Sequence, residues 1–138
     1  MIIVDVNIIL SALIADATTR ELIVTSNHHL CFPEPSLEKI NKYKQLILEK
    51  SELSELEFLV VLNTLFNFIQ IIPLKVIEER WEEAKNVMEH IYPEDVTIIA
   101  AALSRENAII WSDDKHFNKQ EKILSITTRD MITLLSFQ

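Results

Sequence analysis

The sequence predicts an α/β fold built on a parallel sheet. Short apolar segments rich in Ile, Val and Leu alternate with longer amphipathic stretches that have helical spacing. The chain has 138 residues, of which 49% are hydrophobic and 25% are charged. This composition is typical of one compact domain with its own core, and we expect that domain to cover residues 1–138.

The expected strands are short, and start signals mark several of the helices between them. We predict strands at 2–4, 30–32, 71–74, 108–111 and 123–126. Pro35, the capping-box pattern Ser54 to Glu57, and Pro93 mark helix starts. We predict helices over 6–14, 18–26, 35–50, 54–69, 75–90, 94–105 and 128–136. The turn at 49–57 joins two long helices, which we expect to form a projecting arm or an oligomer face.

Several function classes are excluded by what the chain lacks. It contains no glycine, which dinucleotide-binding turns and P-loops need where the backbone approaches phosphate. The lone Cys31 rules out an internal disulfide and a cysteine-based zinc cluster. Residues 1–15 are apolar but carry Asp5 and Asn7 and lack a basic leading segment, so we expect a strand and a helix there rather than a signal peptide. No apolar run is long enough to span a membrane, and we expect a soluble, cytoplasmic protein.

Acidic residues occur where strands end and where helices begin. Asp5 follows the strand at 2–4, and Asp114 comes shortly after the strand at 108–111. Glu38 and Asp95 lie in the first turns of predicted helices, which start at the same edge of a parallel sheet as the strand ends. Four such carboxylates in one crevice repel one another and would either take up protons or collect a hard divalent cation, Mg²⁺ or Mn²⁺. Such ions activate water and clamp phosphate oxygens, which points to phosphoryl chemistry.

The motifs around these acids resemble those of a stand-alone PIN domain. They are Val4-Asp5-Val6-Asn7, Pro33-Glu34-Pro35-Ser36-Leu37-Glu38-Lys39-Ile40, Asp95 before Ile98-Ile99-Ala100-Ala101-Ala102-Leu103, and Trp111-Ser112-Asp113-Asp114-Lys115-His116-Phe117. The resemblance runs from residue 1 to about residue 136. It implies a three-layer α/β/α fold with a central parallel sheet of four or five strands. It also implies a Mg²⁺- or Mn²⁺-dependent ribonuclease of the VapC toxin type, which hydrolyses RNA phosphodiesters.

The resemblance also implies roles for individual residues. The acidic metal site, which is also the catalytic site, would consist of Asp5, Glu38, Asp95 and Asp114. Asn7 and Ser112 would hold these acids in place from behind. Many relatives carry a further Asp two residues after the fourth acid, where this chain has His116, and we place His116 beside the ligands. Imidazole ligates Mn²⁺ but suits Mg²⁺ poorly, which calls a second metal ion into question, and Asp113 would replace Asp114 only if the loop shifted.

Other features bear on partners. The net charge is −8, so RNA contact must be local or assisted by cations. The basic residues that we expect nearest the acidic edge are Arg20, Arg105, Lys115, Lys119 and Lys122. The segment 58–69 is more apolar than one buried face requires, which favours a homodimer interface or a groove for an antitoxin-like helix.

Three alternative interpretations stand beside the nuclease. Taken singly, each acid is explained as a helix cap or a partner of a helix dipole, as are Glu34 and Glu94. A strand followed by Asp also occurs in haloacid-dehalogenase-like phosphatases, although Asn7 stands where their second Asp is needed. A catalytically silent PIN-like module that binds RNA or protein is the other candidate, and His116 is the residue that favours it.

Overall fold

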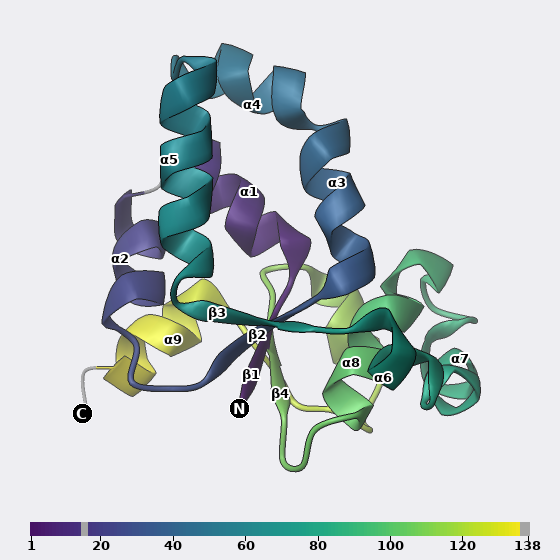
Figure 1. Cartoon of the computed structure of the whole chain (residues 1–138). Helices are drawn as coiled ribbons and strands as arrows, with labels where there is room; N and C mark the ends of the chain where they lie inside the picture. Colours follow the sequence, from purple (N-terminus) through teal and green to yellow (C-terminus); the bar gives the residue numbers. More distant parts are fainter. Residues whose placement is uncertain (15–16, 136–138) are drawn as a thin grey trace.

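The computed structural model, which describes residues 1–14 and 17–135, has a parallel sheet with helices on both faces (Figure 1). The strands are β1 (Ile2–Val4), β2 (Leu30–Pro33), β3 (Ile69–Ile72), β4 (Ile109–Trp111) and β5 (Ser125–Ile126). Within the described residues they form one five-stranded sheet in the order β3-β2-β1-β4-β5, and every neighbouring pair is parallel. The predicted three-layer α/β/α class is therefore confirmed.

Side-chain alternation along the strands divides the core between the two faces of the sheet. Ile2 and Val4 of β1 point to one face and Ile3 to the other, because successive residues of a strand face opposite ways. The first face is covered by α1 (Val6–Ile14), α2 (Ala17–Thr25), α3 (Leu37–Lys42), α4 (Lys44–Ser51), α5 (Glu55–Phe66) and α9 (Thr128–Leu135). The second face is covered by α6 (Leu74–Glu78), α7 (Trp81–Met88) and α8 (Val96–Leu103). In Figure 1, α4 and the adjoining end of α5 stand well away from the sheet, as the predicted arm does.

Two of the predicted long helices are each divided in two. The helix expected over 35–50 is a short 3₁₀ turn, η1 (Glu34–Ser36), followed by α3 and α4, which are separated at Tyr43 (φ −97°, ψ 8°). The helix expected over 75–90 is α6 and α7, separated by a turn that ends at Arg80 (φ −113°, ψ 11°). Neither break contains Gly or Pro, so composition gave no signal for it.

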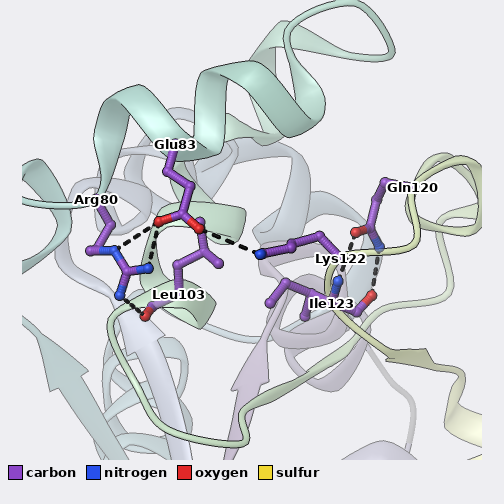
Figure 2. A network of polar contacts seen from close by, with 6 residues as sticks. All are labelled: Arg80, Glu83, Leu103, Gln120, Lys122 and Ile123. Atoms are coloured by element: carbon purple, nitrogen blue, oxygen red, sulfur yellow. Dashed lines mark hydrogen bonds and ion pairs between the residues drawn. The ribbon is translucent and has the colours of Figure 1, made fainter.

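A tertiary contact explains the second break. The Arg80 guanidinium donates to the carbonyl of Leu103, 2.6 Å away at the end of α8, and also to the carboxylate of Glu83 (Figure 2). Lys122 approaches the other oxygen of Glu83 at 3.7 Å, which ties α7 to the loop before β5. The turn before α7 thus lets Arg80 satisfy a carbonyl at the end of another helix.

Smaller boundary differences have local causes. The helix predicted over 54–69 ends at Phe66, because β3 begins at Ile69, two residues before the predicted strand at 71–74. The strand predicted at 123–126 is only Ser125–Ile126, because the Gln120 amide bonds both backbone groups of Ile123 (2.6 and 2.9 Å) and holds that segment as a loop (Figure 2).

The remaining elements follow the prediction closely. The helix expected over 94–105 begins with a 3₁₀ turn, η2 (Pro93–Asp95), and a further 3₁₀ segment, η3 (Lys115–Lys119), was not predicted. Residues 6–14 and 18–26 are helical to within one residue, and α9 follows the prediction to residue 135; residue 136 lies outside the described residues. None of the helices in the described part of the chain is long and apolar enough to cross a bilayer.

Candidate metal centre

The carboxyl ends of β1 and β4 meet at the point where the strand order reverses. From β1 the chain proceeds outward through β2 and β3, then returns to place β4 on the other side of β1. In parallel α/β sheets, ligands bind in the crevice at such a switch point. Asp5 directly follows β1, and its backbone N–H donates to the carbonyl of Trp111, the last residue of β4 (3.0 Å). The fold therefore brings the two predicted acidic loops together.

Ser112 fixes the carboxylate of Asp5. Its hydroxyl donates to Oδ2 of Asp5 at 2.7 Å and accepts the backbone N–H of Asp114 at 3.0 Å. Asp5 is buried, and this burial raises the pKa of its carboxyl, while the hydrogen bond from Ser112 acts in the opposite direction. Ser112 thus lies behind Asp5 as predicted. Asn7 is exposed and lines the cleft beside Asp5.

Asp95 also lies in this cluster of acids, and it comes from a different element. It is the last residue of η2, directly before α8, and it is 8% exposed. Burial, followed by the negative charges of Asp5 and Asp114, raises the pKa of Asp95 to about 6, and His116 acts in the opposite direction. Three of the four predicted acids therefore feel one another's charge.

His116 lies among these acids and not behind them. Its Nδ1 is 3.0 Å from Oδ1 of Asp114 and 3.3 Å from Oδ2 of Asp95. Its ring stacks on Tyr92, with centroids 4.1 Å apart and planes at 28°. One donor atom from each of Asp95, Asp114 and His116 lies within 4.8 Å of the other two.

Two of these atoms are buried without a hydrogen bond. They are Oδ2 of Asp95 and Nδ1 of His116. Their 3.3 Å separation satisfies the distance for an ion pair, but their mutual orientation does not meet hydrogen-bond geometry, so we treat both as unsatisfied. Buried polar atoms that remain unpaired are costly, and a cation bound between them removes that cost. The donor set therefore fits a divalent metal ion.

The acids open onto a cleft of about 280 Å³ that also contains basic and aromatic side chains. Its lining residues are Asp5, Val6, Asn7, Lys39, Lys42, Tyr43, Tyr92, Glu94, Asp95 and Asp114. Lys39, Lys42 and Tyr43 follow one another at helical spacing along α3 and into its end, so they present one face to the cleft. We did not predict these three residues. Their helical spacing after the helix start at Pro35 would have indicated that they share one face.

Glu38 differs from the prediction. It is exposed, and it does not belong to the residues that line the cleft, whereas its neighbour Lys39 does. Consecutive residues of a helix point in directions about 100° apart, so only one of the two faces the acids. The Lys39 ammonium is close enough to Asp5 to oppose the rise in the pKa of that carboxyl. The structure thus brings Asp5, Asp95 and Asp114 together, whereas Glu38 is exposed and lies outside the residues that line the cleft.

The predicted RNA-contact residues fall into two groups. Lys115 and Lys119 are exposed on η3, directly after Asp114. Arg20 lies at the other end of α1 from Asp5, where its guanidinium donates to the carbonyls of Ala12 and Leu13 and closes that helix. Arg105 follows the end of α8 that is remote from Asp95, and its charge opposes the rise that burial causes in the pKa of the Cys31 thiol. Neither arginine is at the acidic edge.

Asp113 and Glu34 have structural partners. Asp113 accepts both the backbone N–H and the hydroxyl of Thr128 (2.7 Å each) at the start of α9, so it does not replace Asp114. Glu34 accepts the backbone N–H of Leu74 at the start of α6 (2.9 Å). Both carboxylates satisfy helix-start N–H groups.

Fold and site together define an α/β protein with an acidic, cation-binding cleft at the switch point of a parallel sheet. The family model described as PIN domain matches residues 3–135, and the chain belongs to this family. PIN domains are generally metal-dependent nucleases. Among curated proteins, none matches the chain. The PIN resemblance is therefore confirmed, and the phosphatase interpretation has no support.

Proposed function

We propose that this protein is a metal-dependent endoribonuclease that hydrolyses RNA phosphodiester bonds. The observation that carries the proposal is the pair of buried, unpaired atoms, Oδ2 of Asp95 and Nδ1 of His116, next to Asp114 at the sheet's switch point. A site built only for stability would pair these atoms with hydrogen-bond donors and acceptors. Membership of the PIN family supports the nuclease class.

The chain's own residues supply the remaining parts of such a site. A Mg²⁺ or Mn²⁺ ion bound by Asp5, Asp95 and Asp114 would provide Lewis-acid activation of water and phosphate. Ser112 keeps the carboxylate of Asp5 oriented toward the cleft. Lys39 and Lys42 provide positive charge for phosphates in a chain whose net charge is −8. Tyr43 and Tyr92 offer aromatic surfaces on which single-stranded bases can stack.

A cleavage assay with a matched variant tests this function. Wild-type protein and Asp5→Asn are incubated with a panel of single-stranded RNAs in Mg²⁺, in Mn²⁺ and in EDTA. We expect cleavage by the wild type in at least one metal, none in EDTA, and none by Asp5→Asn. Asp113→Asn is the control, because Asp113 belongs to the same loop but faces Thr128, and an amide oxygen still accepts from its N–H. We expect Asp113→Asn to cleave like the wild type.

Two outcomes would contradict the proposal. Cleavage that survives in Asp5→Asn at the wild-type rate would remove the acidic cleft from the reaction. A folded wild type that cuts no RNA in either metal would favour the catalytically silent module instead. That alternative has one observation in its favour, which is His116 beside Asp95, where the PIN resemblance leads us to expect a further acid.

Within the nuclease class, we favour a toxin-type component of a toxin–antitoxin pair or an RNA-processing enzyme that works in the cytoplasm. The support is an apolar surface on α5, formed by Leu56, Leu59 and Val60, which are 72%, 46% and 57% exposed. Exposed apolar residues that gather on one helix mark an interaction surface. A second copy of the chain is the partner that we propose for it, and an antitoxin-like helix is the alternative.

A further inference from the structure

The candidate metal centre contains an imidazole nitrogen in addition to carboxylate oxygens, and this bears on which ion it takes. Nδ1 of His116 is 3.0 Å from Oδ1 of Asp114 and 3.3 Å from Oδ2 of Asp95. Two ligands at right angles on an ion, each about 2.1 Å from it, are about 3.0 Å apart. The observed separations are therefore those of neighbouring ligands around one small cation.

The orientation of these atoms supports the same interpretation. Oδ2 of Asp95 and Nδ1 of His116 are buried and lack hydrogen-bond partners, although they lie within contact distance of each other. The two atoms are close together but are not oriented for a hydrogen bond to each other. This is the arrangement expected if both atoms face an ion that lies between them. Asp95 is 8% exposed, so its Oδ2 has little contact with bulk water.

One contact restrains the imidazole ring of His116, and a second restrains its backbone. Tyr92 stacks on the ring at 4.1 Å between centroids. The backbone N–H of His116 donates to Oδ1 of Asp114 at 3.0 Å, which ties the start of the residue to the same carboxylate. A ligand fixed in this way loses little freedom when an ion binds.

We propose that His116 ligates the metal ion directly through Nδ1, with Asp95 and Asp114, and that the site takes Mn²⁺ or another first-row transition-metal ion in preference to Mg²⁺. Mg²⁺ keeps oxygen ligands and water, whereas imidazole suits the transition metals. In the ligating state the ring is neutral, with its proton on Nε2. The inference rests on the metal site of the proposed nuclease, and it corrects the expectation that His116 stands behind the ligands.

Pulsed electron paramagnetic resonance of bound Mn²⁺ tests the ligand directly. A coordinated imidazole gives a ¹⁴N coupling that carboxylates and water do not give. We expect this coupling in the wild type, its loss in His116→Asp, and its retention in His90→Asn, which alters an exposed histidine outside the cleft. Absence of the coupling from the wild type, or its survival in His116→Asp, would overturn the proposal. Circular dichroism of His116→Asp establishes that the variant is folded.

Titration calorimetry tests the selectivity. We expect the wild type to bind Mn²⁺ at least about tenfold more tightly than Mg²⁺, and His116→Asp to reduce this ratio about tenfold. Equal affinities in the wild type would contradict the inference.

The outcomes also separate this inference from the nuclease. RNA cleavage that requires Asp5 but shows no ¹⁴N coupling would leave the nuclease intact and overturn the role of His116. A ¹⁴N coupling without cleavage of any RNA would do the reverse.

Discussion

Asp95 is the residue of the site whose burial most clearly lowers the stability of the folded protein. It keeps its proton up to about pH 6 in the folded protein, because it is buried beside Asp5 and Asp114. In the unfolded chain its pKa returns to 3.8. Between these values the folded state binds a proton that the unfolded state has lost, so the free energy of unfolding falls as pH rises. Without metal, this acid destabilises the protein near neutral pH.

A pH series in EDTA measures that cost. Relative to Asp95→Asn, the wild type should lose up to about 3 kcal/mol of unfolding free energy between pH 4 and pH 7. The measurement is urea denaturation of both proteins, because their difference removes the titration of groups that do not interact with Asp95. Mn²⁺ added at pH 7 should restore the wild type and leave Asp95→Asn nearly unchanged. If the wild type instead gains stability over this pH range relative to the variant, the folded protein does not disfavour the charged form of Asp95.

At the scale of elements, α3 presents its basic face to the acids. Lys39 and Lys42 line the cleft that also contains Asp5, Asp95 and Asp114. In a catalytically silenced Asp95→Asn background with Mg²⁺, we expect Lys39→Ala and Lys42→Ala each to weaken RNA binding. Each lost phosphate contact should reduce the slope of log affinity against log salt by about 0.7 for single-stranded RNA. Fluorescence anisotropy at several salt concentrations measures this slope.

Lys50→Ala is the matched control for these variants. Lys50 is exposed on α4 and does not line the cleft. It should leave the slope unchanged. An equal effect from all three lysines would mean that RNA binds through overall charge and not in the cleft.

Helix α4 ends without the glycine that commonly follows a helix. Glu52 follows α4 in the left-handed conformation (φ 61°), where glycine is common and this chain has none. Replacing Glu52 by glycine removes about 1 kcal/mol of backbone strain from the folded state. The greater conformational freedom that glycine gives the unfolded chain partly offsets this gain. We expect Glu52→Gly to raise the unfolding free energy by about 0.5 kcal/mol. Glu49→Gly, inside the same helix, should lower it by about 1 kcal/mol. Urea denaturation measures both, and a loss in both would contradict the assignment of strain to Glu52.

The whole molecule explains which parts of the site the sequence could predict. Asp5 and Asp114 lie in one cleft, at the sheet edge that the sequence predicted, because a residue that follows a parallel strand lies at the carboxyl edge of the sheet. Lys39 lines the cleft where the prediction named Glu38, because a helix that starts one residue earlier or later rotates a different side chain into the cleft. The break before α7 accompanies a contact between Arg80 and Leu103, 23 residues further along the chain. Local patterns contain no record of such contacts.

The α5 surface is a prediction at the same scale. If a second copy covers Leu56 and Val60, Leu56→Glu places a charge in that interface and should shift the protein toward monomer. Sedimentation velocity at several concentrations measures the shift. Leu124→Glu is the control, because Leu124 is similarly exposed (65%) but follows η3, far along the chain from α5. A wild type that sediments as a monomer at all concentrations would contradict the homodimer.

The bond between Ser112 and Asp5 joins residues 107 positions apart in the chain. A ribosome making this protein therefore releases Asp5 early and can complete the acidic cleft only after Asp114 and His116 have left the exit tunnel. Until then the nascent chain has no assembled acidic cleft. The acidic cleft is thus assembled only after residues 112–116 have been synthesised, and a fragment without these residues lacks it.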